Sequence, residues 1–203
     1  ISNGDSHMMK NMEWGAVAYL KQSKYGLGTI DIGVNNNSSY ITGCGAQSGS
    51  SESTLCNAYN TANGMLASTT GNIYGVYDMS GGAWEYVMGN MVNSSGAFYS
   101  SESGFSSAPE AKYYDKYTYS TDYEAHGRGK IGDATKETLL SFGSYTGGWY
   151  SDYANFVGFS YSWFSRGGYV DDYIDSIIAG VFNFSSYDGN TVTNTGTRAV
   201  LCP

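Results

Sequence analysis

The stretch from residue 72 to residue 87 reads NIYGVYDMSGGAWEYV, and it carries more structural information than any other part of the chain. It begins with an apolar run, passes through a turn at the Gly-Gly pair and ends in a short segment typical of a strand. Two successive glycines allow a turn that Cβ atoms would obstruct. We expect Tyr77, Met79 and Trp84, together with Trp14 upstream, to anchor a hydrophobic core around that turn.

Outward from this stretch, the chain predicts few regular elements. Residues 11–20 read as a short helix with Asn11 as its N-terminal cap. Residues 133–140 read as one or two further helical turns. Short strand-like pieces, such as 179–184 and 198–201, alternate with long loops rich in Ser and Gly. The expected fold class is therefore α+β: irregular, with short strands, few helices and long loops.

Length, composition and charge limit the number of domains and the kinds of binding partner. The chain has 203 residues, of which 41% are hydrophobic and 14% charged, with a net charge of −8. This suits a single domain, which we place at residues 9–203, after a ragged lead or cloning remnant at residues 1–8. Nucleic-acid binding is not expected, because the 10 Lys and Arg residues do not cluster. Membrane insertion is not expected either, since no apolar run approaches the length of a transmembrane helix.

Three cysteines are present, Cys44, Cys56 and Cys202. Cys44 and Cys56 bracket a Ser- and Gly-rich loop, and a disulfide between them would stabilise the fold by about 2–3 kcal/mol. We favour that disulfide, and the alternative is a pair of unbonded thiols. Cys202 is then left over, either as a free thiol or bonded to a segment outside this chain.

Patterns of catalysis and metal binding are weak throughout. Residues 127–132 have the spacing G-x-G-x-x-G, but the polar residues before them do not form the buried strand that a dinucleotide site requires. The two histidines, His7 and His126, lie in no nucleophile motif, and the spacing of Cys and His offers no zinc site. The acidic cluster at residues 171–175 could serve acid–base chemistry or hold calcium, but a solvated loop is the favoured interpretation. We expect no enzyme activity, no cofactor and no metal.

The amino-acid composition of the C-terminal region is more informative than any of these patterns. Residues 164–203 contain no Lys, Glu, Gln, Met or Trp, although these five types occupy 27 of the first 163 positions. At that frequency, about six or seven such residues would be expected in the last 40. C-terminal strands and loops that simply select small and aromatic residues are one explanation. The composition nevertheless changes within a single domain, which indicates a specific cause.

Three motifs follow one another in the chain. Residues 11–18 match the pattern E-A-E-W-E-Y-A-A-R in part, and residues 72–87 match N-x-[YW]-G-L-x-D-M-x-G-N-V-W-E-W closely. Residues 166–168 (RGG) and 196–198 (GTR) match R-G-G-S-W and G-F-R in part, with close to the usual separation. From about residue 9 onward, the chain thus resembles the formylglycine-generating-enzyme-like branch of the C-type lectin fold. The family's first strands are missing, so we expect this chain to be the C-terminal part of a longer protein.

The departures from that family point to one of its branches. Its enzymes oxidise a substrate cysteine with a cysteine pair between R-G-G and G-F-R, whereas residues 169–195 contain no Cys. The calcium-and-glycan triplets of sugar-binding lectins are absent as well. The variable proteins of diversity-generating retroelements fit better, since they carry diversified residues between these two motifs. Their mutagenesis acts on adenines, chiefly in asparagine-type codons ending in a pyrimidine, and such codons cannot yield Lys, Glu, Gln, Met or Trp when randomised.

The resemblance therefore implies a ligand-binding display domain, outside the cell on a bacterial surface or a phage particle, with a diversified recognition surface at residues 169–195. The ligand would be a protein or another cell-surface molecule. Tyrosine anchors, acidic side chains and adaptable hydroxyl and amide groups would share the binding. The candidate binding residues are Tyr169, Val170, Asp171, Asp172, Tyr173, Ile174, Asp175, Ser176, Ser185, Ser186, Tyr187, Asp188, Asn190, Thr191, Thr193 and Asn194.

Two other functions stay open at this point. A structural or adhesive bacterial surface domain would carry no variation confined to residues 169–195. An oxidase of the formylglycine-generating type would need Cys44, Cys56 or Cys202 as its catalytic thiols.

Overall fold

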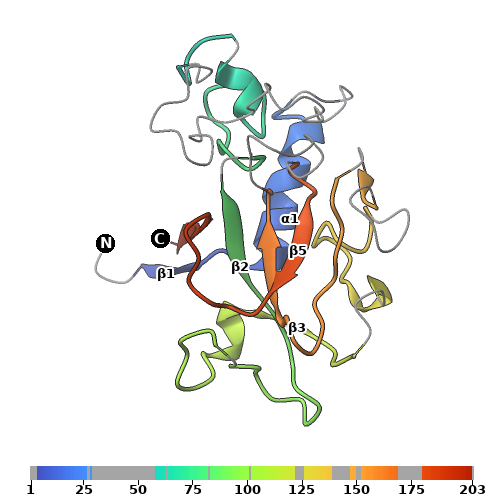
Figure 1. The fold of residues 1–203 in the computed structure, drawn as a ribbon. Helices are drawn as coiled ribbons and strands as arrows, with labels where there is room; N and C mark the ends of the chain where they lie inside the picture. Colours follow the sequence, from blue (N-terminus) through green and yellow to red (C-terminus); the bar gives the residue numbers. More distant parts are fainter. Residues whose placement is uncertain are drawn as a thin grey trace.

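The computed structural model describes residues 4–26, 28, 58–62, 64–81, 83–100, 102–121, 126–138, 147–149, 152–168 and 180–202. These residues form one short α-helix and several short strands in mixed sheets, connected by long loops (Figure 1). The α+β class predicted from the sequence is therefore confirmed at this level.

The central strand is β2 (Trp84–Met91), whose first four residues are the last four of the stretch 72–87. It pairs in parallel with β3 (Asp115–Tyr117) and β6 (Thr195–Thr197), and antiparallel with β4 (Trp163–Arg166). On its other side β4 pairs antiparallel with β5 (Phe184–Tyr187), so the main path runs β3-β2-β4-β5. In this order β5 is the end strand, and it lies within the candidate binding segment 169–195.

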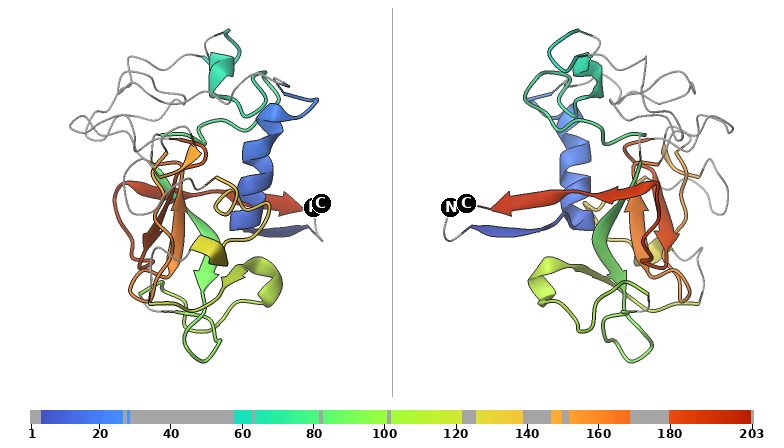
Figure 2. Two further views of the ribbon diagram at one scale, coloured as in Figure 1. Left: turned by 90° about the vertical axis from the view of Figure 1, so that its right-hand side faces the viewer. Right: turned by 60° about the vertical axis from the view of Figure 1, so that its left-hand side comes forward.

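The two ends of the described chain lie side by side. Strand β1 (Asp5–Met8) pairs antiparallel with β7 (Ala199–Cys202), which brings the N- and C-termini together (Figure 2). The lead that we expected at residues 1–8 thus forms, from Asp5 onward, part of the ordered structure. Cys202 lies exposed at the end of β7, opposite Asp5, whereas Cys44 and Cys56 fall outside the described residues.

The predicted N-terminal helix is confirmed as α1 (Asn11–Tyr19), and a 3₁₀ turn continues it over Leu20–Gln22. Asn11 is not its cap, as we expected; Lys10 takes that position, and its backbone N–H donates to the Glu13 carboxylate at 2.8 Å. The side chain of Asn11 instead turns inward and donates to the Tyr117 hydroxyl at 2.7 Å. Further 3₁₀ turns lie at Gly64–Ala67, Ala111–Tyr113 and His126–Arg128.

The helical turns expected at residues 133–140 are not formed in the described part of that stretch, where residues 131–138 make a run of turns. The reason lies in Asp133, whose carboxylate is fully buried. It accepts from the backbone N–H groups of Lys130 and Thr135 at 2.9 and 2.8 Å, and from the Tyr117 hydroxyl at 2.8 Å. Asp133 therefore organises a buried loop, because its partners come from both sides of it in sequence.

Hydrophobic side chains are buried on both faces of the sheet. Val87 and Met88 are neighbours in β2 but belong to different clusters, because successive strand side chains point to opposite faces. The larger cluster packs against α1 through Trp14, and it also contains Met79. Both residues are buried core anchors, as predicted. Tyr77 and Trp84 are only half-buried, and Tyr74 from the same stretch is 87% exposed.

Candidate ligand-binding surface

The predicted binding residues divide into two groups. The first eight, residues 169–176, lie outside the described residues. The other eight lie in β5 and in the loop between β5 and β6. They are Ser185, Ser186, Tyr187, Asp188, Asn190, Thr191, Thr193 and Asn194.

Strand β5 presents alternate side chains to the core and to the surface. Phe184 and Ser186 are buried, while Ser185 is half-buried and Tyr187 is 37% exposed. The Ser186 hydroxyl lies 3.2 Å from the side-chain amide of Asn155, which donates to it. Ser186 therefore supports the strand from inside and does not face a ligand.

The loop after β5 is organised around Asn190. Its backbone N–H donates to the Asp188 carboxylate at 3.0 Å, and its side-chain amide donates to Asp188 and to Glu102, each at 2.8 Å. Its backbone carbonyl accepts from the Tyr86 hydroxyl at 3.0 Å. These bonds fix the loop to β2 and to the loop that contains residue 102. Thr191 and Thr193, further along, remain exposed.

Aromatic side chains surround this loop. Tyr187 meets Tyr86 edge-on at 5.9 Å between ring centroids, and it lies 6.5 Å from Tyr161. Phe105 stacks on the buried Trp163 at 5.8 Å, with 15° between the ring planes. Burial, followed by the nearby charge of Asp188, raises the pKa of the Tyr86 hydroxyl. That hydroxyl therefore acts as a neutral hydrogen-bond donor at ordinary pH.

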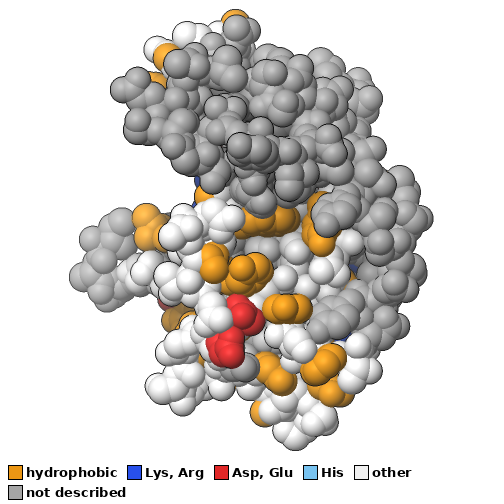
Figure 3. Space-filling model, viewed as in Figure 1, with side chains coloured by type: hydrophobic (Ala, Val, Ile, Leu, Met, Phe, Trp, Pro, Cys, Tyr) orange, Lys and Arg blue, Asp and Glu red, His pale blue; other side chains and the backbone are white. Residues whose placement is uncertain are grey.

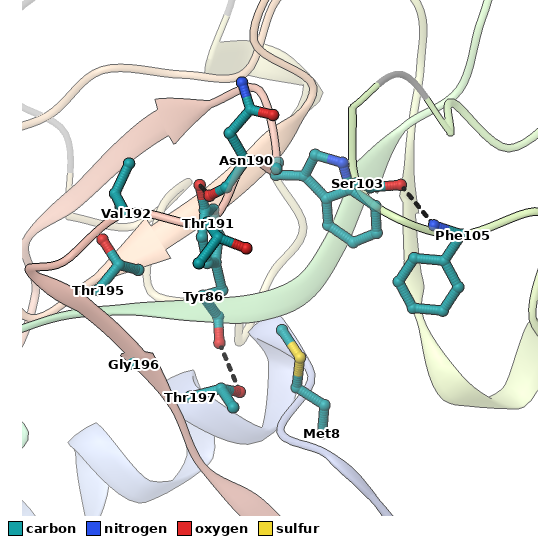
Figure 4. A pocket seen from close by; sticks show the side chains of 12 residues that line it. Met8, Tyr86, Ser103, Phe105, Asn190, Thr191, Val192, Thr195, Gly196 and Thr197 are labelled. Carbon is teal, nitrogen blue, oxygen red and sulfur yellow. Dashed lines mark hydrogen bonds between the residues drawn. The ribbon is translucent and has the colours of Figure 1, made fainter.

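A pocket of about 280 Å³ opens between these groups. Figure 4 shows Tyr86, Asn190 and Phe105 around it, each contributed by a different segment of the chain. On the face seen in Figure 3, acidic side chains lie beside hydrophobic ones. The residues that line the pocket are Met8, Tyr86, Ser103, Phe105, Trp163, Gly189, Asn190, Thr191, Val192, Thr195, Gly196 and Thr197.

Sequence reasoning missed part of this lining. Tyr86, Phe105 and Trp163 are far apart in the chain; the pairing of β2 with β4 brings the segments of Tyr86 and Trp163 together, and Phe105 joins them by stacking on Trp163. One signal in the sequence was available for Phe105. It is a large apolar residue in a Ser-rich loop, but single exposed apolar residues are common on protein surfaces, so this signal alone does not mark a binding site.

The motif at residues 72–87 contacts both motifs that flank the candidate segment. The carbonyl of Gly167 accepts from the N–H groups of Gly81 at 2.9 Å and Gly180 at 3.1 Å. Arg198 donates to the Glu85 carboxylate through Nε and Nη2, and also to the carbonyl of Asp78 at 2.6 Å. The motifs at residues 72–87, 166–168 and 196–198 thus form one contiguous structure.

A buried acid, Asp152, contacts the middle of the candidate segment at Gly180 and Phe182. Asp152 is 3% exposed and accepts from the N–H of Phe182 at 3.1 Å. Its carboxylate lies so close to Gly180 that a Cβ there would overlap it. Burial raises the pKa of Asp152 well above its usual range. Phe182 itself is fully buried, so residues 180–186 form the support of the surface rather than its exposed part.

Comparisons of the chain with family models, with curated proteins and with solved structures find no match. No helix within the described ranges has the length and apolar character that crossing a membrane requires. The same residues hold no group of three or more His, Cys, Asp or Glu side chains placed to bind a metal ion. The proposals for family and function therefore depend on the motifs and on the geometry of this surface.

Proposed function

We propose that this chain is a ligand-binding display domain of the C-type-lectin-like fold, with residues 169–195 as its diversified recognition surface. In this proposal it acts as a variable protein of a diversity-generating retroelement. It is exposed on a bacterial cell or a phage particle, and it binds a protein or another cell-surface ligand without catalysing a reaction.

The observation that carries this proposal is the coincidence of two boundaries. The five residue types that randomised asparagine-type codons cannot yield are absent from residues 164–203. The R-G-G and G-T-R motifs at 166–168 and 196–198 flank the same part of the chain, and both contact the stretch 72–87. A segment that starts and ends on one rigid support can change its side chains without changing the fold.

The described half of the segment has the character that binding requires. Tyr187, Thr191 and Thr193 are exposed, and their backbone is fixed by the hydrogen bonds of Asn190. A preorganised loop loses little conformational entropy on binding, and tyrosine offers a large contact area with few rotatable bonds.

The test is to sequence the coding region deeply from a growing population of the source. Substitutions are expected only in codons 169–195, at positions where a nearby template repeat carries adenine, beside a reverse transcriptase gene. Codons 180, 182 and 184, whose residues are buried or lie against Asp152, should stay constant. Substitutions spread evenly over the whole coding region, or none at all, would favour the structural or adhesive surface domain.

The oxidase alternative has its own test. Native alkylation of Cys44, Cys56 and Cys202, followed by mass spectrometry, measures how reactive each thiol is. A catalytic thiol would react far faster than the cysteine of an unstructured peptide alkylated under the same conditions. Bonded or uniformly slow cysteines would argue against an oxidase.

A further inference from the structure

Two carboxylates, Glu102 and Asp188, directly precede Ser103 and Gly189 in the lining of the pocket, and the ion pairs among the described residues include neither of them. Glu102 and Asp188 both accept from the side-chain amide of Asn190, which lines the pocket. All 10 Lys and Arg residues belong to the described part of the chain, and none forms an ion pair with either carboxylate. The Asn190 amide donates to Oε2 of Glu102.

The segments around the pocket are themselves poor in basic residues. Residues 84–110 contain no Lys or Arg, and residues 152–197 contain only Arg166. Arg166 is fully buried against Trp14 and Phe184, so its charge does not reach the rim. Arg198, which follows the lining residue Thr197, is paired with Glu85, so the charges of Glu102 and Asp188 favour a cationic ligand.

The walls of the pocket add a second requirement. Phe105, 39% exposed, stacks on Trp163, and Tyr86 forms another part of the wall. Aromatic rings attract a guanidinium group and pack well against the methylene stem that carries it. An arginine side chain meets both requirements at once, because its planar head also donates to two acceptors.

We propose that this pocket binds a basic side chain, arginine in particular, presented by a protein partner. The stem lies against Phe105 and Tyr86, and the guanidinium donates to the carboxylates of Glu102 and Asp188 next to the Asn190 amide that bridges them. The recognition surface thus extends outside residues 169–195. The inference rests on the proposed function only in taking the ligand to be a protein, and it does not require that any codon be diversified.

The experiment is an NMR titration of the whole ¹⁵N-labelled chain with N-acetyl-arginine methylamide. The matched probe is N-acetyl-citrulline methylamide, which has the same shape but no charge. The arginine probe should shift the indole resonance of Trp163 and the side-chain amide of Asn190, and the citrulline probe should bind about fivefold more weakly. Glu102→Gln should weaken the arginine probe about fivefold, whereas Glu110→Gln, at an exposed carboxylate, should not.

Equal binding of the two probes, or shifts confined to other residues, would overturn the proposal. So would unchanged arginine binding by a folded Glu102→Gln variant. Phe105→Ala provides a second measurement, since loss of the aromatic wall should weaken both probes together. Tighter binding of methyl glucoside than of arginine at the same resonances would reassign the pocket to glycans. Because Glu102 and Phe105 lie outside residues 169–195, an absence of codon variation in that segment would leave this result unaffected.

Discussion

At the scale of single residues, the shape of the pocket depends on Gly189. Its φ is +94°, and a Cβ at this position would lie 2.8 Å from Nε1 of Trp163 and 2.9 Å from Cα of Ser103. Trp163 is 2% exposed, and Cα of Ser103 belongs to the backbone, so neither atom can move aside easily. The turn that places Asp188 and Asn190 over the indole therefore needs glycine.

Gly189→Ala should consequently destabilise the protein more than Gly96→Ala does. Both positions have positive φ, but Gly96 has open space where its Cβ would be. We expect the alanine at residue 96 to cost about 1 kcal/mol of unfolding free energy from backbone strain alone. The alanine at residue 189 should cost about 2 kcal/mol more, because of the steric overlap. Urea unfolding measures both values, and equal losses would show that the loop relaxes around the added methyl group.

The second residue-scale prediction concerns Asp152 and pH. Burial raises the pKa of Asp152 in the folded state above its usual 3.8, so the folded protein holds this proton more tightly than the unfolded chain does. This contribution to stability is complete below the unfolded pKa and is lost as the pH rises above about 4 toward the folded pKa. Asp152→Asn should flatten this decline and be at least as stable as the parent at pH 8.

Unfolding free energies measured from pH 4 to pH 8 test that sign. Glu110→Gln serves as the control, since its exposed carboxylate should leave the pH dependence unchanged. A steeper decline with pH in Asp152→Asn than in the parent would contradict the assignment.

At the scale of elements, the two ends of β5 have different roles: one end packs in the core, and the other is exposed on the candidate binding surface. Phe184 is fully buried and lies against Phe156, Phe164 and Arg166, whereas Tyr187 at the other end of the strand is exposed. Phe184→Ala should cost about 3 kcal/mol or more of unfolding free energy. Tyr187→Ala should cost less than about 1 kcal/mol. Thermal unfolding followed by circular dichroism distinguishes them, and similar losses would mean that Tyr187 belongs to the support.

Some of these helices and strands could be predicted from the sequence, and others could not. Helix α1 and strand β2 were predictable, because each has a local pattern of apolar residues and turn signals. The C-terminal strand-like piece was expected at 179–184, but β5 lies at Phe184–Tyr187, since its register follows from pairing with β4. The turns at 131–138 were not predictable, because the side chain that fixes them, Asp133, bonds to Tyr117 from a distant strand.

The candidate site likewise has one part that could be predicted from the sequence and one part that could not. Its C-terminal part follows from composition and motif order, which are properties of one continuous stretch. Its pocket could not be predicted, since Tyr86 and Trp163 become neighbours only through the pairing of β2 with β4, and Phe105 reaches them from a distant loop. Ser186 was expected on the surface, and the alternation of β5 buries it.

At the scale of the whole molecule, Arg166 joins segments from nearly the full length of the chain. Its guanidinium donates to the Asn11 side chain and to the carbonyls of Asp133 and Ala134, each at 3.4 Å. It also lies over the rings of Trp14 and Phe184. Burial lowers the pKa of Arg166 to about 10, so the side chain remains charged at neutral pH.

Arg166→Met should therefore lower the unfolding free energy of the entire domain by about 3 kcal/mol, because buried acceptors on α1 and in the 133–134 loop lose their donor. Arg166→Lys should fall between methionine and the parent, since an ammonium keeps the charge but cannot reach three acceptors as the planar fork does. Lys24→Met, at an exposed lysine, should change stability by less than about 0.5 kcal/mol. Urea unfolding followed by both tryptophan fluorescence and circular dichroism is the measurement. Coincident transitions would show that Arg166 stabilises one cooperative unit, whereas a loss confined to one probe would mean that it holds only its local segment.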